Sequence, residues 1–540
     1  MDKKRGVAQF LLEHAAGEPV SFHMPGHKGG RLYREYGYEE FLERVMDCDV
    51  TEFPGADNLF QPEGVIRETM NRYKTIYGAK ESFLLVGGSS AGLIAAIMTC
   101  VPAGGKLIMA RNCHKAVFNG LRLAGGQPVY AYPQELAGAG ISGPVLPSEI
   151  KRCLAEHPDA SAVILPSPNY YGICSDIKGI ADLVHEAGMV LIVDQAHGAH
   201  LKLFDQYAGS WTGGAASGRE AGATEGLRTA DRKRDSLSGA ADGLRAADRF
   251  RAAENQGADV IVESTHKTLA SCTQSAIVNL NSDRVDQYVF ADKLQMIEST
   301  SPSYLLMASL DINADLMEKR GQELTKQWEA DLRYFYEEAK MIPGLRVLEH
   351  PMLDPTKINL DMSGCGLTGL QLEEQLMERG IFVELVTGDI LMCMTGIGNR
   401  RCDYDRLLAA LREISDEQWS ATGHSPCTPC MRPAADLPEQ VGLGLQTPLM
   451  EKRPSGRQAV TLKKLSQREI PEICERVPVS EAAGRVCGSS IVPYPPGIPI
   501  ICPGEVMDAE VLAYAAALRE AGEKVMGIDE AGFVLAGKEI

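Results

Sequence analysis

The sequence predicts an α/β protein whose large domain is built on a mostly parallel sheet. Short apolar runs rich in β-branched residues recur along the chain, as is typical of buried strands. Several of these runs end in a cluster of Ser, His, Asp or Lys, and open α/β sheets bind ligands at the carboxyl ends of their strands. The 540 residues, 44% of them hydrophobic, suffice for a large core and for two or more domains. The clearest runs are 106–110, 162–165, 189–194 and 259–263.

Composition narrows the possible functions. A net charge of -18 and a pI near 5.2 argue against a nucleic-acid partner, which needs a basic surface, and suit a cationic substrate. No apolar run has the length of a membrane span, and no secretion signal is recognisable, so we expect a cytoplasmic protein with reduced cysteines. Cys427 and Cys430 form one CxxC pair, but a structural zinc needs four ligands, so we expect no metal.

The amino-terminal segment combines a short helix with an irregular loop. Residues 1–20 carry apolar residues at helical spacing, and residues 21–30, SFHMPGHKGG, are too rich in Pro and Gly for regular structure. We expect this loop to expose His23, His27 and Lys28. The intervening Pro and Gly prevent the helix that would bring both histidines to one zinc ion.

Residues 82–101 predict a strand, a Gly-Gly-Ser-Ser turn and an apolar helix. The hydroxyls of Ser89 and Ser90, with backbone N–H groups at the helix start, could hold a phosphate, although Gly and Ser also serve as ordinary turn and capping residues. The next strand, residues 106–110, leads to His114. This imidazole could stack on a flat cofactor ring or lie on the surface.

Two strand ends carry the strongest chemical signals. The strand in residues 189–194 stops at Asp194, and a carboxylate at the end of a buried strand needs a cationic partner such as a protonated ring nitrogen, or a structural partner. The strand in residues 259–263 runs into Ser264, His266 and Lys267. A lysine at this position could form a Schiff base with an aldehyde cofactor, or simply be a solvated lysine at a helix start.

The chain divides into five expected parts. Residues 206–256 contain the near repeat GLRTADR and GLRAADR and are read as a low-complexity, mobile insertion without a catalytic role. Near the carboxyl terminus we expect helices at 467–476 and 508–521. The parts are an amino-terminal arm and loop (1–35), a cofactor-binding large domain (36–300), a helix with a small α/β domain (301–416), a linker (417–460) and a carboxyl-terminal domain (461–540).

Eight motifs, taken together and in order, resemble those of the bacterial ornithine/lysine/arginine decarboxylases. These enzymes have the aspartate-aminotransferase fold, fold type I, and use pyridoxal 5'-phosphate (PLP). The resemblance implies a three-layer PLP-transferase large domain followed by smaller α/β domains, as in the short, biosynthetic-type members. The motifs are FHMPGHKGG, DVTEFPGADNLFQPEG, GGSS, ARNCHK, DQAHGAH, ESTHKTL, STSPSY and VPYPPGIPIICPGE.

The resemblance also implies roles for the residues around the cofactor ring. Lys267 corresponds to the Schiff-base lysine, and Asp194 to the acid that keeps the pyridine nitrogen protonated. Ala196 would lie against one face of the ring and His114 would stack on the other. His197 lies where related DxAH enzymes contact the ring hydroxyl.

Four further residues correspond to phosphate ligands in the family, namely Ser89, Ser90, Ser264 and His266. Glu384 resembles an acid that approaches the distal cation of the substrate. The GGSS turn differs from the Asn-Gly-Thr or Asn-Gly-Ser of many relatives, but this difference removes no reactive group.

The implied reaction is decarboxylation of arginine, lysine or ornithine to agmatine, cadaverine or putrescine. Arginine is favoured over lysine, although no residue separates the substrates. The alternatives are another fold type I reaction, such as an aminotransferase or α-oxoamine synthase reaction, and a catalytically silent PLP-binding regulator. In the family the active site lies between subunits, with the 299–304 loop of one facing the cofactor of the other, so we expect at least a homodimer.

Overall fold

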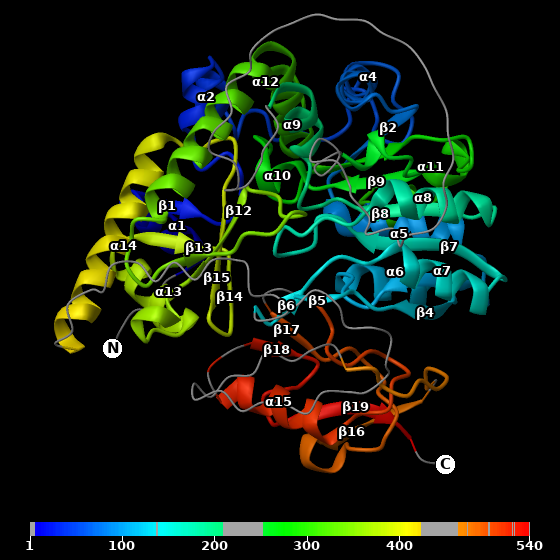
Figure 1. The fold of residues 1–540 in the computed structure, drawn as a ribbon. Helices are drawn as coiled ribbons and strands as arrows, with labels where there is room; N and C mark the ends of the chain where they lie inside the picture. Colours follow the sequence, from blue (N-terminus) through cyan, green and yellow to red (C-terminus); the bar gives the residue numbers. More distant parts are fainter. Residues whose placement is uncertain are drawn as a thin grey trace, which may run out of the picture.

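The computed structural model describes residues 6–136, 139–208, 252–422, 463–471, 473–494, 497–520, 522 and 524–538. Most of the expected insertion (209–251), most of the expected linker (423–460) and the Cys427–Cys430 pair lie outside these residues. The described chain forms three bodies (Figure 1): a large sheet domain, a smaller domain beside it and a carboxyl-terminal domain below both.

The large domain is built on a seven-stranded sheet of order β2-β10-β9-β8-β7-β3-β4. Only β10 runs antiparallel to its neighbours, so the predicted fold class is confirmed. The strands at its centre are apolar and buried because helices cover the sheet. Their bounds are β2 Glu81–Leu85, β3 Lys106–Ala110, β4 Gln127–Ala131, β7 Ala160–Pro166, β8 Val190–Asp194, β9 Val260–Glu263 and β10 Ala276–Leu280.

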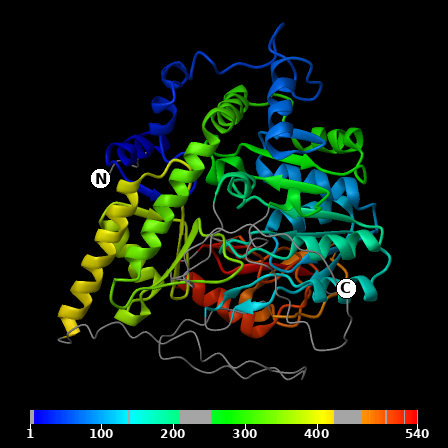
Figure 2. The same ribbon diagram turned by 45° about the horizontal axis from the view of Figure 1, so that its top comes forward.

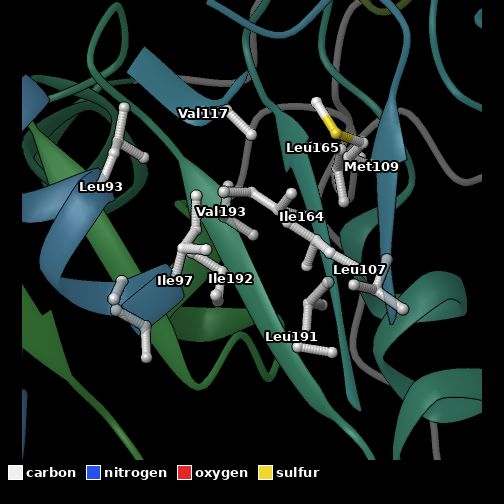
Figure 3. Close-up of a cluster of buried hydrophobic side chains, with 14 of the residues drawn as sticks. Leu93, Ile97, Leu107, Met109, Val117, Ile164, Leu165, Leu191, Ile192 and Val193 are labelled. Atoms are coloured by element: carbon white, nitrogen blue, oxygen red, sulfur yellow. The ribbon is translucent and has the colours of Figure 1, made fainter. Parts of the chain in front are cut away.

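Two groups of helices pack on this sheet, α5 with α6 and α11, and α7 with α8. Figure 3 shows Leu93 and Ile97 of α5 beside Ile192 and Val193 of β8. At Gly92 the helix approaches so closely that a Cβ would lie 2.6 Å from Val278 Cγ2, which explains this glycine. The bounds are α4 Val65–Tyr77, α5 Gly88–Cys100, α6 Lys115–Ala124, α7 Pro147–Glu156, α8 Ile177–Glu186, α9 Leu201–Tyr207, α10 Thr265–Thr268 and α11 Gln287–Ile297.

The smaller domain combines a second sheet, of order β11-β12-β15-β14, with several helices. The amino-terminal strand β1 pairs in parallel with β13, so the start of the chain belongs to this domain. Figure 2 shows the long helices α12 and α14 side by side. The bounds are α1 Val7–Ala16, β1 Val20–Phe22, α2 Arg31–Glu35, α3 Glu39–Glu43, α12 Tyr304–Ala339, β11 Arg346–Val347, β12 Lys357–Asp361, α13 Gly369–Glu378, β13 Ile381–Val383, β14 Leu385–Thr387, β15 Ile390–Met394 and α14 Arg401–Thr422.

The carboxyl-terminal domain corrects one sequence-based expectation. The helix expected at 467–476 is wrong, because β16 (Cys474–Pro478) pairs there with β19 (Phe533–Gly537), and Pro471 interrupts the segment. The helix expected at 508–521 is confirmed as α15 (Ala509–Glu520). In the same domain β17 (Val492–Tyr494) pairs with β18 (Lys524–Met526). A short pair outside this domain, β5 (Glu135–Leu136) with β6 (Ile141–Ser142), follows β4 in the chain. Helix α14 continues to Thr422, into the start of the expected linker.

Candidate active site

Lys267 lies on the short helix α10, directly after β9. Its Nζ is 2.9 Å from His197 Nε2 and 5.8 Å from the centre of the Tyr170 ring. Burial lowers the pKa of Lys267, Lys357 lowers it further, and the carboxylates of Asp194 and Glu384 oppose this shift. An amine shifted in this direction is a better nucleophile near neutral pH.

Asp194 lies at the end of β8, the strand next to β9. It is buried and accepts a hydrogen bond from Ala196 N at 3.1 Å. Burial raises the pKa of its carboxyl, while Lys267 opposes the shift. Within the described ranges no Lys, Arg or His side chain forms an ion pair with Asp194, so this carboxylate can receive a cationic ligand group.

Two histidines flank this pair. His114 caps α6, where its Nδ1 accepts from Ala116 N at 3.2 Å, and burial with the nearby Lys267 lowers its pKa to about 3. Burial, Lys267 and Lys357 also lower the pKa of His197 well below its usual value. Both rings are therefore neutral near pH 7, and a neutral ring can stack on a flat cofactor without electrostatic cost.

The expected phosphate ligands lie near the start of α5 and the turn after β9. Ser89 and Ser90 are in the first turn of α5, where the helix dipole favours an anion. Among the described residues, the buried Ser264 Oγ has no hydrogen-bond partner, and such a hydroxyl suits a phosphate oxygen. His266 Nδ1 instead contacts Ser275 O at 2.7 Å, and burial lowers its pKa to about 4.

A carboxylate beside this phosphate region was not foreseen. Glu298 Oε1 accepts hydrogen bonds from Val86 N at 3.1 Å and Gly87 N at 2.9 Å, just before α5. Burial raises the pKa of Glu298, which favours its uncharged form. Glu298 follows α11 without a recognisable motif, so only the folded chain reveals that it reaches the turn.

Glu384 lies between β13 and β14 in the smaller domain, and its Oε2 accepts from Met24 N at 2.9 Å. Its charge acts on the pKa of both Lys267 and Lys28, so it faces the same region as the other candidates. The sequence suggested that Lys28 is exposed, but its side chain is buried. Its Nζ donates to Met394 O at 3.0 Å and to His23 O, and burial lowers its pKa to about 7.

The loop that carries Lys28 packs against the Lys267 helix through its backbone. Gly26 N donates to His266 O at 2.7 Å, and a Cβ at Gly26 would lie 2.4 Å from the carbonyl carbon of Thr268. The expectation of a solvent-exposed loop is therefore wrong for its centre. Glycine is required at position 26 because the two backbones meet there.

One cavity brings most of the candidates together. It has a volume of about 30 Å³, and the Tyr170 ring, whose centre is 4.5 Å from that of the His197 ring, forms part of its wall. The donor set itself fits PLP: an amine, a carboxylate, a flat imidazole and hydroxyls near a helix start. The lining residues include Ser89, His114, Asp194, Ala196, His197 and Lys267.

Comparison with known proteins agrees with this geometry. The family model for the Orn/Lys/Arg decarboxylase major domain matches residues 7–225 and 245–338, and the model for the carboxyl-terminal domain of the same family matches residues 445–532. An arginine decarboxylase of Bacillus subtilis is 28% identical over 530 residues, covering 96% of this chain and 94% of that protein. The lysine decarboxylase LdcA of Pseudomonas aeruginosa is 23% identical, covering 92% and 73%.

A solved structure shows the same fold. The lysine decarboxylase LdcF of Francisella novicida superposes with a TM-score of 0.65 at 17% identity, covering 98% of this chain and 80% of that one. The two family models together cover most of the sequence, and the chain belongs to the Orn/Lys/Arg decarboxylase family.

Proposed function

We propose that this chain catalyses the PLP-dependent decarboxylation of a basic amino acid, with arginine as the first candidate substrate. The observation that carries the proposal is the pairing of two neighbouring strand ends. Lys267 lies after β9 with its Nζ 2.9 Å from a neutral His197, and the buried Asp194 ends β8 in the same cavity. An amine and an acid arranged in this way suit a pyridinium aldehyde cofactor.

The roles follow from the contacts. When bound, PLP supplies an electron sink for the electron pair left behind as CO2 departs. Asp194 would hold the proton on the ring nitrogen of bound PLP, and His114 and Ala196 would orient the ring. Lys267 Nζ returns a proton to the substrate Cα, and its contact with the neutral His197 Nε2 holds the amine in place for this step.

The remaining residue assignments concern the phosphate and the substrate. Ser89, Ser90, Ser264 and His266 are proposed as phosphate ligands, and the unpartnered Ser264 Oγ is the best supported of them. Glu384 is proposed to bind the distal cation of the substrate. Relatives at 28% identity are named arginine decarboxylases and a more distant one a lysine decarboxylase, which favours arginine.

The test is CO2 release by the purified full-length chain with PLP, measured in parallel on arginine, lysine and ornithine. We expect one of them, arginine first, to release CO2 with an equal amount of its amine. Lys267→Ala should abolish both this activity and the visible absorbance that appears when PLP binds.

Two other outcomes would change the proposal. Transfer of the amino group to an oxo acid without CO2 would favour an aminotransferase, and formation of a carbon–carbon bond would favour an α-oxoamine synthase. PLP binding that Lys267→Ala abolishes, with no turnover of any substrate, would indicate a regulator.

We also propose that the chain acts as at least a homodimer. A cavity of about 710 Å³ lies beside the start of α5, lined by Ser299, Ser301 and Ser303 of the loop that the resemblance assigns to the subunit contact, together with Gly87 and Glu298. One chain has a mass of 58.5 kDa, and sedimentation equilibrium should give at least twice this mass. A mass of 58.5 kDa would contradict this assembly.

The expected cytoplasmic location remains a proposal. It is supported by the 12 described cysteines, which are all free thiols. None of the helices in the described ranges is both long and apolar enough to span a bilayer. Fractionation of the native host, with the chain followed by an antibody, tests the location.

A further inference from the structure

A buried group of charged and polar side chains lies behind the candidate site, where the smaller domain meets the large one. Its centre is Lys357, the first residue of β12, which is fully buried. Lys357 Nζ is 3.2 Å from Asp354 Oδ2 and donates to Thr356 Oγ1 at 3.1 Å. In a third contact, Lys357 Nζ donates to the backbone oxygen of His197 at 2.9 Å, which connects the group to the candidate site.

The other end of the group reaches the residue next to Lys267. His200 Nδ1 lies 3.2 Å from Thr268 Oγ1, and His200 Nε2 lies 3.2 Å from Asp354 Oδ1. His200 and Asp354 are both buried. One connected group therefore contacts His197 on one side of the Lys267–His197 hydrogen bond and Thr268 on the other.

The backbone of Gly172 lies directly against the side chain of Lys357. Gly172 has a φ of +91°, and a Cβ there would lie 2.7 Å from the Cβ of Lys357. A buried ammonium depends on a carboxylate, and Asp354 supplies it. Lys357 with His200 lowers the pKa of Asp354, so Asp354 stays charged beside Lys357.

The charges around the Lys267 amine explain what this lysine can do. Asp194 from β8 and Glu384 from the smaller domain favour the protonated amine, whereas Lys357 from β12 opposes protonation, and the adjacent His197 is neutral. A second cation close to an amine makes its uncharged, nucleophilic form easier to reach.

We propose that Lys357 is a positioning residue that fixes His197 against Lys267 through the His197 carbonyl, so that two buried amines contact the same histidine. The inference deepens the proposed function and rests on it for the role of Lys267. Its test is independent, however, because the state of the amine is measurable without turnover.

The experiment measures acetylation of Lys267 by acetic anhydride as a function of pH, in the full-length protein without added cofactor. The modified peptide is quantified by mass spectrometry. Only the uncharged amine reacts, so the midpoint of the profile reports the protonation of Lys267. In Lys357→Met we expect the midpoint to rise by roughly 1 pH unit, since a like charge has been removed. At a pH below both midpoints, labelling then slows by roughly tenfold.

Two further variants make the result decisive. Lys28→Met removes another buried lysine, whose Nζ contacts the oxygens of His23 and Met394, and should leave the Lys267 midpoint unchanged. If Lys357→Met fails to fold by circular dichroism, Lys357→Met/Asp354→Asn removes both buried charges and should raise the midpoint in the same direction.

The proposal and the proposed function can fail separately. A folded Lys357 variant with an unchanged Lys267 midpoint overturns the role of Lys357, whatever the activity. A raised midpoint in a protein that decarboxylates none of the three amino acids supports Lys357 and contradicts the reaction. If both hold, the acidic limb of the kcat/KM profile should also move to higher pH in the variant.

Discussion

The pair Arg111–Glu505 joins the carboxyl-terminal domain to the strand end that leads to His114. Both side chains are fully buried and meet in two bonds, Nε to Oε1 at 3.1 Å and Nη2 to Oε2 at 2.9 Å. Arg111 Nη1 also donates to Pro499 O at 2.6 Å, and Cys502 N donates to Glu505 Oε2 at 2.8 Å. Every one of these contacts crosses to, or lies within, the carboxyl-terminal loop.

Replacing Glu505 by leucine should destabilise the fold strongly, because the guanidinium of Arg111 then stays buried without a counter-ion. The loss of one partner of a buried pair costs about 3–5 kcal/mol. At about 4 kcal/mol the folding equilibrium constant falls roughly a thousandfold. Urea unfolding followed by circular dichroism measures the change as a lower midpoint with a similar slope.

The matched double variant Arg111→Met/Glu505→Leu should recover most of the lost stability, since two apolar side chains of similar size replace the pair. As a surface control, Lys463→Met removes the solvent-accessible ion pairs of Lys463 with Asp508 and Glu510 and should leave the urea midpoint nearly unchanged. The reasoning is refuted if the free energy of unfolding of Glu505→Leu lies within about 1 kcal/mol of that of the unsubstituted chain, or if the double variant is as unstable as the single one.

Three further predictions concern the site. Glu384→Gln should raise KM for the basic substrate at least tenfold with little change in kcat, and equal KM values in a steady-state assay would contradict the assignment. In the folded chain the pKa of His114 is about 3 and that of His266 about 4, below the value near 6.5 of an unfolded histidine. Between these values the unfolded chain binds more protons than the folded chain, so stability falls as the pH drops from 6.5 towards 4. The urea midpoint should therefore be lower at pH 5 than at pH 7. Gly26→Ala should lower both the melting temperature and Lys267-dependent PLP absorbance, because the new methyl group would lie 2.4 Å from the Thr268 backbone; an unchanged absorbance would contradict this.

The sequence predicts the large sheet and the central pair of site residues because both depend on local patterns. Apolar runs define β8 and β9. Asp194, the last residue of β8, and Lys267, which follows β9, line one cavity because the two strands are neighbours in the sheet. The buried position of Lys28 could not be predicted, since a loop rich in Pro and Gly usually faces solvent. Only tertiary contacts place its amine among backbone oxygens.

Contacts between distant parts of the chain limit prediction in the same way. Arg111 and Glu505 are 394 residues apart, and neither lies in a pattern that reveals its partner. Lys357 reads as an ordinary strand residue at the start of 357–361. The helix wrongly expected at 467–476 fails for a related reason, because the partner strand β19 lies more than fifty residues later and its pairing outweighs local helix preference.

The segments that fix the Lys267 helix come from two distant parts of the chain, around Gly26 and around Ile397. Gly26 N donates to His266 O at 2.7 Å, Ile397 N donates to Thr268 O at 2.9 Å, and Gly398 N donates to Gly26 O at 3.0 Å. Hydrogen bonds from backbone groups do not depend on side-chain rotamers, so they hold the helix in one position whatever Lys267 binds. The side-chain group centred on Lys357 contacts this helix at Thr268 and also contacts His197, which lies beside the Lys267 amine. The amine is therefore positioned mainly by the smaller domain and the amino-terminal loop, while the large sheet supplies its acid partner, Asp194.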